Sequence, residues 1–256
     1  MKLISMNIRG LRERIKRKYI SDLIRKQQVG VICLQKTKCE QIGKERFYQI
    51  WGSNEIDWIE IGVVNNGGGL ITMWKKDCFE MKRFRNGNNF SIIEGVWKLG
   101  MPVEITITNV YCGGTLREKR IIWDEKNEVR KNHPIKLCVA RDFNSIRSVG
   151  ERRCQSSNVN YSSEIQSFNN FIEESCLVDI PLVGRKFTWY KPNGTIKSII
   201  DRVLVSLEWL EKWSRSKLYA EGRTVSDHCA LTLKDINIDW GPKPFKCLDV
   251  SKRCPF

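Results

Sequence analysis

Short apolar runs separated by polar turns dominate the hydrophobic pattern of this chain from its first residues to about residue 233. Runs of this length, rich in branched and aromatic residues, predict β-strands rather than helices. The strands that the pattern predicts cover residues 2–8, 29–34, 47–51, 58–64, 70–74, 79–84, 90–97, 103–111, 135–140, 187–189, 198–205 and 229–233.

Helical periodicity is limited to three segments. Apolar residues recur at helical spacing around residues 20–24 and more regularly over residues 163–174, where Ser162 or Ser163 is expected to be the N-cap. Residues 115–132 carry a weaker apolar stripe. Many strands with few helices, and neither a linker nor an internal repeat, predict one α+β domain with two packed sheets and helices outside.

Polar side chains stand at the ends of several predicted strands. A buried strand rarely ends in an acid unless that acid has partners. A cleft lined by such side chains suits Mg²⁺ or Mn²⁺, because carboxylate and amide oxygens are the ligands that magnesium prefers. Such a cation neutralises phosphate charge, so the pattern indicates chemistry on a phosphodiester. The strand-end residues are Asn7, Gln35, Tyr111, Asp142 with Asn144, Asp201, and Asp227 with His228.

Alternative roles stay open for the most prominent of these residues. Asp142 and Asn144 follow an apolar run, but Asp and Asn in this place are also typical of a turn, because their side chains bond the nearby backbone. Of the two histidines, His133 lies among polar residues and is expected to be solvated. His228 follows an aspartate at the start of an apolar run and is the candidate imidazole for acid–base work.

The chain is strongly basic, with 44 lysines and arginines against 29 acidic residues and a net charge of +15. This excess points to a polyanion, nucleic acid first and an anionic membrane second, although a basic surface can also serve solubility alone. No apolar run approaches the ~18 residues of a membrane-spanning helix, and the apolar start is too short for a signal peptide. We therefore expect no membrane partner.

The ten cysteines form no C-x-x-C pair, and their spacing matches no zinc module. This usage predicts a reducing compartment, the nucleus or the cytoplasm. The three glycines at residues 67–69 lack the Lys-Ser or Lys-Thr pair of a P-loop, and no small-molecule cofactor is expected. We expect the chain to act as a monomer.

Eight short motifs, in this order and at these separations, resemble those of the endonuclease/exonuclease/phosphatase superfamily with its DNase I-like fold. More narrowly, the chain resembles the N-terminal endonuclease domain of plant LINE-type, non-LTR retrotransposon proteins. The resemblance implies a four-layer α/β/β/α sandwich over residues 1–245 and a truncated tail, 246–256, without a polymerase. The motifs are SMNIRGL at 5–11, ICLQ at 32–35, GGGL at 67–70, NVY at 109–111, DFN at 142–144, GRKFTW at 184–189, IDRVLVS at 200–206 and SDH at 226–228.

The same resemblance implies hydrolysis of a DNA phosphodiester that nicks one strand and leaves a 3′-hydroxyl. His228 would hydrogen-bond the phosphate, and Asp201 would orient its imidazole. Asp142 and Asn144 would position and deprotonate the attacking water, and Tyr111 would contact the phosphate.

The resemblance also implies a metal ion, Mg²⁺ or Mn²⁺, held beside Asn7 and Asp227 together with the residue at position 36. Asn7, Arg9 and Thr188 would contact the DNA substrate, with Thr188 lining the cleft.

Two positions depart from the family's pattern. The family's second strand is followed by a glutamate, the principal metal ligand, but this chain has Lys36, whose ammonium carries the metal's own sign of charge. Two glycines usually precede the aspartate at position 142, but this chain has Ala140 and Arg141. We therefore expect impaired metal binding and impaired catalysis. Three alternatives stay open: a non-catalytic DNA-binding remnant, a phosphatase of the same superfamily, and a lysine that itself stands in for the cation.

Overall fold

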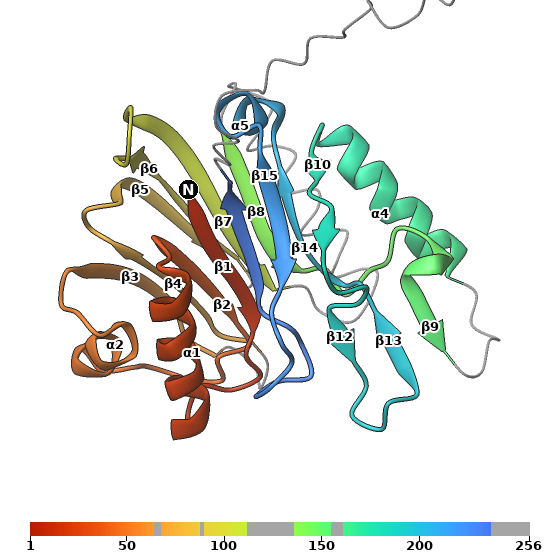
Figure 1. Cartoon of the computed structure of the whole chain (residues 1–256), viewed down its shortest axis with the longest axis horizontal. Coiled ribbons are helices and arrows are strands. Elements are labelled where there is room, and N and C mark those ends of the chain that lie inside the picture. Colours follow the sequence, from red (N-terminus) through yellow and green to blue (C-terminus); the bar gives the residue numbers. More distant parts are fainter. Residues whose placement is uncertain (64–67, 88–89, 112–135, 155–160, 237–256) are drawn as a thin grey trace, which may run out of the picture.

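The computed structural model describes residues 1–63, 68–87, 90–111, 136–154 and 161–236 of the chain, which form two mixed β-sheets and a small third sheet (Figure 1). The predicted helix 115–132, His133 and the tail 246–256 lie outside the described residues. Among the helices that are described, none has both the length and the apolar character needed to cross a membrane.

The first sheet has seven strands with β1 at its centre. Their order is β11 (Leu182–Val183), β15 (Ser216–Ala220), β16 (Leu231–Asp235), β1 (Lys2–Asn7), β2 (Val31–Gln35), β4 (Leu70–Lys75) and β3 (Ile56–Ile61). Strands β1 and β2 are parallel, and Asn7 pairs with Gln35. The loops that follow these two strands therefore leave the sheet side by side.

The second sheet has six strands in the order β10 (Val178–Asp179), β14 (Asp201–Val205), β8 (Leu137–Asp142), β7 (Val103–Tyr111), β6 (Phe90–Trp97) and β5 (Phe79–Gly87). Asp142 pairs with Tyr111 of the parallel strand β7 and with Asp201 of the antiparallel strand β14. Three predicted site residues thus lie in one row across this sheet. The small third sheet consists of β12 (Trp189–Tyr190), β13 (Ile196–Ser198) and β9 (Arg152–Cys154).

Helices cover the outer faces of the two large sheets. Helices α1 (Arg14–Gln27) and α2 (Lys44–Trp51) pack on the first sheet, and α4 (Ser162–Glu174) packs on the second (Figure 1). Two short elements, the 3₁₀ helix η1 (Val149–Glu151) and helix α5 (Leu207–Lys212), lie in connections. The predicted four-layer α/β/β/α sandwich is confirmed.

Side chains alternate between the two faces of each strand, and this alternation explains how the layers pack. On β1, Leu3 joins the core between the two sheets, whereas Ile4 and Met6 join the core under α1 and α2. On β8, Cys138 lies between the sheets and Val139 lies under α4. Because successive residues of a strand point to opposite faces, Asn7 and Asp142 both fall on the faces that meet between the sheets.

The prediction of a strand over residues 47–51 is wrong, because these residues form the second half of α2. Phe47, Ile50 and Trp51 are buried at helical spacing, against the outer face of the first sheet. Aromatic and branched residues in a short run favour a strand by composition, but here the spacing of three and four residues decides the structure.

Three smaller predictions also need correction. The predicted strand 187–189 is ordered as a strand only from Trp189, and the predicted strand 198–205 is divided between β13 and β14. The residue before α4 is Tyr161, which makes no side-chain capping bond, so neither predicted serine is the N-cap. Strands β9, β10, β11 and β15 were not predicted, and the first three of these have only two or three residues.

Candidate active site

The carboxyl ends of β1 and β8 meet between the two sheets, where their last residues are hydrogen-bonded to each other. The Nδ2 atom of Asn7 donates to the Oδ2 atom of Asp142 at 2.8 Å, across 135 residues of sequence. Both side chains are deeply buried, with 0% and 1% of their surface exposed. The fold thus brings together two predicted site residues from different sheets.

His228 is the second partner of Asn7. Its Nε2 atom lies 3.2 Å from the Nδ2 atom of Asn7. The hydroxyl of Ser226 donates to the main-chain oxygen of Asn7 at 2.8 Å and accepts from the backbone N–H of His228 at 3.2 Å. Ser226 therefore fixes the loop that carries His228 against the end of β1. The sequence showed Ser226 only as part of a motif, without a role of its own.

Asp201 holds the other side of the imidazole. The Nδ1 atom of His228 lies 2.9 and 3.0 Å from the two carboxylate oxygens of Asp201. In the neutral imidazole, Nδ1–H donates to Asp201 and Nε2 accepts from Asn7. Burial raises the pKa of Asp201. Burial alone would lower the pKa of His228, but the charges of Asp201 and Asp142 outweigh it and raise that pKa. The carboxylates around the imidazole thus favour its protonated form.

Thr188 lies behind Asp201 rather than on the cleft surface that was predicted for it. Its side chain is 0% exposed, and its hydroxyl accepts from the backbone N–H groups of Ile200 and Asp201 at 3.1 Å each. Its backbone oxygen accepts from the N–H of Cys229 at 2.7 Å. Thr188 therefore holds the two segments that carry Asp201 and His228 together, and it has no surface with which to contact DNA.

Asp227 is already paired with a cation of the chain. Its Oδ2 atom lies 2.5 Å from Nη1 of Arg9 and also accepts from the indole N–H of Trp189 at 2.8 Å. Arg9 stands in the left-handed region, with φ 50°, directly after β1, and its side chain is 43% exposed. Trp189, which the sequence showed only within a motif, thus anchors one of the predicted metal ligands.

Lys36 follows β2 and lies on the same edge. Its φ is 54°, and its backbone oxygen accepts from the N–H of Gly10 at 2.7 Å. Its Nζ atom lies over the ring of Tyr111, 4.7 Å from the ring centre. Burial lowers the pKa of Lys36; Asp142 and Asp227 act against this effect, and Arg9 acts with it. Lys36 is therefore half-buried among the charged groups of the site.

The loop that carries Lys36 is held by the glycine turn before β4. The N–H groups of Thr37 and Lys38 donate to the oxygens of Gly69 and Gly68, at 3.1 Å each. Gly69 has φ +81°, and a Cβ atom there would lie 2.4 Å from the hydroxyl of Thr37. The turn therefore requires glycine at position 69 for a close backbone approach, and Gly68 and Gly69 hold the loop that carries Lys36.

Asp142 and Asn144 combine the two interpretations that the sequence left open. The N–H of Asn144 donates to the Oδ1 atom of Asp142 at 3.0 Å, and Asn144 has φ 50°, so a local turn is present. The Oδ2 atom of Asp142 nevertheless faces Asn7. The turn thus holds the carboxylate in the site.

A buried amide pair supports the floor of the site. Gln35 donates from Nε2 to Oδ1 of Asn109 at 2.8 Å and to the hydroxyl of Ser5 at 3.1 Å. Asn109 donates from Nδ2 to the oxygen of Ile71 at 3.0 Å. These bonds join β7 of the second sheet to β1, β2 and β4 of the first. Buried polar groups of this kind specify one arrangement when they are bonded, and the sequence showed Asn109 only as part of a motif.

Arg141 lies on the other face of β8, away from the site. It is 0% exposed, and its guanidinium lies 4.5 Å from the ring centre of Phe143. None of its three guanidinium nitrogens has a hydrogen-bond partner among the described residues. Burial lowers the pKa of Arg141 to about 9, although Asp142 acts in the opposite direction. This second departure from the family's pattern thus affects the strand that carries Asp142 rather than the cleft itself.

The divalent cation that the resemblance implies would lie among the charged groups of this site. Asp142, Asp201 and His228 form a described group whose ligand atoms, all within 4.8 Å of one another, could hold a metal ion. Hydrogen bonds already join this group, through Nδ1 of His228 and through the Asn7 amide. Beside Asn7 and Asp227, where the ion is expected, Lys36 and Arg9 supply positive charges. The residues at that position therefore do not fit a divalent metal.

Sequence comparison places the chain in a family. A model of the "Endonuclease/Exonuclease/phosphatase family" matches residues 4–228, most of the chain and every residue of the site described above. The chain belongs to this family.

Solved structures of low sequence identity share the fold. An AP endonuclease, LMAP, from Leishmania major is 16% identical, with a TM-score of 0.69, 91% of this chain and 86% of that one covered. A variant of the 3′ phosphatase NExo from Neisseria, bound to a product DNA hairpin, is 15% identical, with a TM-score of 0.71 and coverages of 92% and 99%. The endonuclease domain of TRAS1, a telomere-specific non-LTR retrotransposon, is 11% identical, with a TM-score of 0.65 and coverages of 91% and 97%.

Proposed function

We propose that this chain is the DNA endonuclease domain of a LINE-type retrotransposon protein, in which Lys36 impairs metal-dependent nicking of a phosphodiester. The observation that carries the proposal is the hydrogen-bonded series from Asp201 through His228 and Asn7 to Asp142, at the edge where the two sheets meet. The family match and the likeness to the TRAS1 endonuclease domain support it.

The side chains of the site divide the proposed reaction among them. His228, oriented by Asp201, donates a hydrogen bond from its protonated Nε2 to a phosphoryl oxygen, in place of the bond that the neutral Nε2 accepts from Asn7. Asp142 accepts the proton of the attacking water, and Asn144 lies beside that carboxylate at the loop. Tyr111 carries the phosphate at the rim, next to Lys36. The water oxygen bonds to phosphorus as the bond between phosphorus and the 3′ oxygen breaks. The 3′ oxygen takes a proton from solvent, which leaves a nicked strand with a 3′-hydroxyl and a 5′-phosphate.

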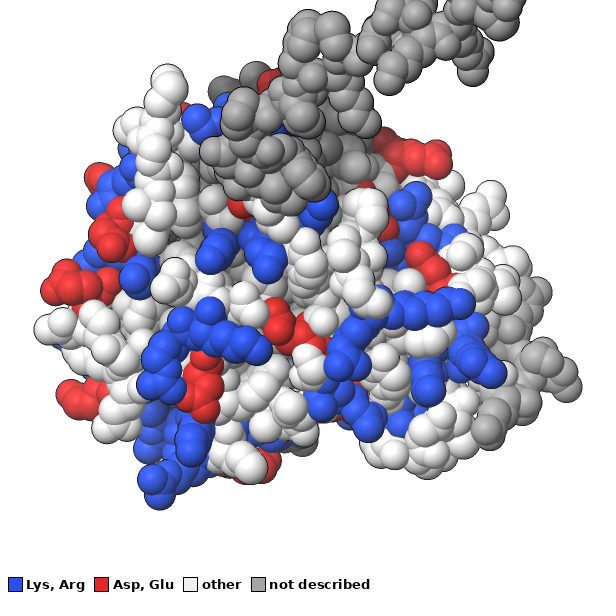
Figure 2. Space-filling view, in the orientation of Figure 1, with Lys and Arg blue, Asp and Glu red and all other residues white. Residues whose placement is uncertain are grey.

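The charge distribution supports a nucleic acid as the substrate. Figure 2 shows lysine and arginine side chains gathered over α1 and again near β12 and β13. The first turn of α1 has no acidic residue. Phosphate contacts from such side chains supply most of the affinity that does not depend on sequence.

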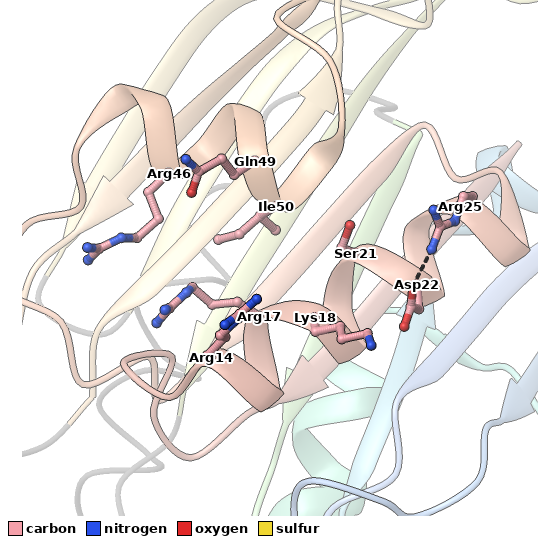
Figure 3. Close-up of a pocket in the computed structure, with 9 residues that line it drawn as sticks. All are labelled: Arg14, Arg17, Lys18, Ser21, Asp22, Arg25, Arg46, Gln49 and Ile50. Carbon is pink, nitrogen blue, oxygen red and sulfur yellow. Dashed lines mark hydrogen bonds and ion pairs between the residues drawn. The ribbon is translucent and has the colours of Figure 1, made fainter.

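A basic hollow between α1 and α2 adds to this surface. Its volume is about 400 Å³. Figure 3 shows the guanidinium groups of Arg14, Arg17 and Arg46 at the same end of it, whereas Arg25 pairs with Asp22. Helix α1 follows the loop after β1, and Nζ of Lys16 donates to the backbone oxygen of Arg9 at 2.9 Å. Helix α1, which lines the hollow, is therefore joined by a short loop to the edge of the site. A DNA strand that binds in the hollow meets cations along this path.

Catalysis is impaired in this proposal for two reasons: the reacting groups are buried, and Lys36 carries a positive charge. Asn7, Asp142 and His228 are at most 2% exposed. A phosphate that approaches the edge meets Arg9 and Lys36 first, and neither side chain can act as a metal ligand. The machinery for proton transfer is thus retained, but the electrophilic stabilisation that a divalent ion supplies is lost.

The test is nicking of supercoiled plasmid in the presence of Mg²⁺ or Mn²⁺. The unmodified chain should leave the plasmid supercoiled, whereas Lys36→Glu should nick it at a rate at least about tenfold higher, because a carboxylate ligand returns. The double variant Lys36→Glu/His228→Ala serves as the matched control and should be inactive.

Two results would contradict the proposal. Efficient nicking by the unmodified chain, abolished by His228→Ala, would show that Lys36 does not impair the site. Release of phosphate from a 3′-phosphorylated oligonucleotide by Lys36→Glu, without any nicking, would show a phosphatase instead.

A further inference from the structure

Lys36 and Arg9 are two cations that the fold holds on one edge by separate supports. Arg9 is held by Asp227 at 2.5 Å, and the Nζ atom of Lys36 lies 4.7 Å from the ring centre of Tyr111. Lys36 makes no ion pair with a carboxylate among the described residues, and the charge of Arg9 acts on it. Asp142 and Asp227 act on Lys36 in the opposite direction to Arg9, but neither is close enough to form an ion pair with it, so the ammonium keeps donors for an anion.

The backbone at this edge is fixed in a way that keeps both side chains in place. Arg9 and Lys36 have φ of 50° and 54°, a conformation in which a residue with a Cβ atom is strained. The oxygen of Lys36 accepts from Gly10, and the oxygen of Thr37 accepts from Leu11, at 2.7 and 2.8 Å. Strain of this kind persists where the surroundings enforce it, and it is concentrated at functional sites. The loops after β1 and β2 therefore stabilise each other and keep both cations in position.

The charges of the site make a metal ion unnecessary for binding an anion here. A glutamate and a divalent cation together carry one net positive charge, and a lysine carries the same charge alone. Nη1 of Arg9 is bonded to Asp227, which leaves the other guanidinium donors of Arg9 and the ammonium of Lys36 to bind an anion. The two cations stand at the mouth of the site, and Arg9 is 43% exposed. An anion that arrives thus meets positive charge without an added ion.

We propose that Lys36 and Arg9 form a cation pair that binds a phosphodiester group of DNA without a divalent metal ion. The inference rests on the function proposed above and makes that same site a metal-independent binding site. The guanidinium of Arg9 offers planar donors to phosphate oxygens, and the ammonium of Lys36 offers a compact charge.

The experiment is a fluorescence-anisotropy titration of a labelled short DNA duplex, in EDTA and in Mg²⁺, at one fixed salt concentration. The unmodified chain should bind equally, within about twofold, in the two solutions. Lys36→Met and Arg9→Met should each weaken binding in EDTA by on the order of tenfold, the effect of losing one charged hydrogen bond.

Lys38→Met is the matched control, because Lys38 lies two residues away, is exposed and has φ 53°. It removes the same charge from the same strained backbone, and it should change the affinity by less than about threefold. Arg9 and Lys36 lie in different loops. If one of the two methionine variants fails to fold, the other still tests the proposal. Circular dichroism verifies the fold of each.

Lys36→Glu separates the two roles of the position. It should bind most weakly in EDTA and recover when Mg²⁺ is added, whereas Lys36→Met should not recover. Binding by the unmodified chain that requires Mg²⁺, or equal losses in Lys36→Met and Lys38→Met, would overturn the inference. Absence of DNA binding by the unmodified chain in either solution would instead contradict the proposed function.

Discussion

The surroundings of His228 differ from those of a buried histidine that serves packing alone. It is 2% exposed, it lies between Asp201 and Asn7, and Asp142 and Asp227 also act on it. A buried imidazole that only filled space would lose its charge, because burial disfavours the charged form. Here the surrounding carboxylates reverse that effect.

We expect His228 to titrate above the ordinary histidine value of about 6.5. An NMR titration of the imidazole protons measures this, and His133→Gln removes the signal of the other histidine. Asp201→Asn should lower the midpoint, because it removes the first of the charges that raise the pKa. A midpoint below about 6.5 in the unmodified chain would contradict the assignment of the proton.

The same shift has a consequence for stability, with a fixed sign. A raised pKa in the folded state means that His228 stabilises the fold fully below the unfolded value, about pH 6.5. This contribution is lost as the pH rises through the folded pKa.

Individual site residues could be predicted from the sequence to different degrees. Asn7, Asp142 and His228 were predicted from polar side chains at strand ends, and the structure places them within hydrogen-bonding distance. Thr188 was predicted on the cleft, but it is buried behind Asp201. A hydroxyl that caps backbone N–H groups and one that contacts a ligand look the same in a sequence, since both follow an apolar residue in a short polar stretch.

At the scale of the element, the two faces of strand β8 carry charged side chains in different surroundings. Asp142 points between the sheets and is hydrogen-bonded, whereas Arg141 points under α4 and its guanidinium has no hydrogen-bond partner among the described residues. Directly across the strand pair, Arg202 is also buried, but it bonds Asp179 at 2.6 Å and pairs with Glu151. The two arginines therefore form a natural comparison.

We expect Arg141→Met to raise the free energy of unfolding by about 1–4 kcal/mol, because it removes a buried charge without a partner and fills the same space. Arg202→Met, the control, should lower it by about 3–5 kcal/mol, because Glu151 and Asp179 lose their buried cation. Asp179 then keeps Arg147, which is partly exposed, at 3.4 Å. Urea denaturation measures both.

The pH dependence of the Arg141 effect is fixed by its lowered pKa. The unfolded chain binds the proton of Arg141 more tightly than the folded chain does, so stability should rise with pH above about 9. The difference in the free energy of unfolding between the unmodified chain and Arg141→Met should therefore decrease above about pH 9. A destabilised Arg141→Met variant at neutral pH would contradict this view of β8.

Elements were predicted well where an alternating pattern was long, as for β6 and β7, and poorly where it was short. Helix α2 was taken for a strand because its apolar residues lie close together in a run of five. Strands β10 and β11 have two residues each, too few for a pattern. Their places are set by pairing with β14 and β15, which is a tertiary interaction rather than a local one.

At the scale of the whole molecule, the site exists only because two sheets pack face to face. The four-layer architecture could be predicted from the number of strands and from the motifs, and it is confirmed. The row formed by Tyr111, Asp142 and Asp201 could not be predicted, because it depends on the register of β7, β8 and β14. The pairing of Arg9 with Asp227, across 218 residues, is also invisible to any local pattern.

The side chains that we propose to transfer protons lie within hydrogen-bonding distance of one another, and two cations of the chain, Arg9 and Lys36, stand where a metal ion is expected. The positive charge at position 36 is therefore expected to prevent metal binding. A direct measurement of metal binding tests this without any catalytic step.

The measurement is a titration of each protein with Mn²⁺, followed by the electron paramagnetic resonance signal of the free ion. The unmodified chain and Lys36→Met should leave the Mn²⁺ signal as it is in buffer, whereas Lys36→Glu should remove about one equivalent of ion, because it adds a carboxylate ligand and removes a like charge. Uptake of one equivalent by the unmodified chain would contradict the account.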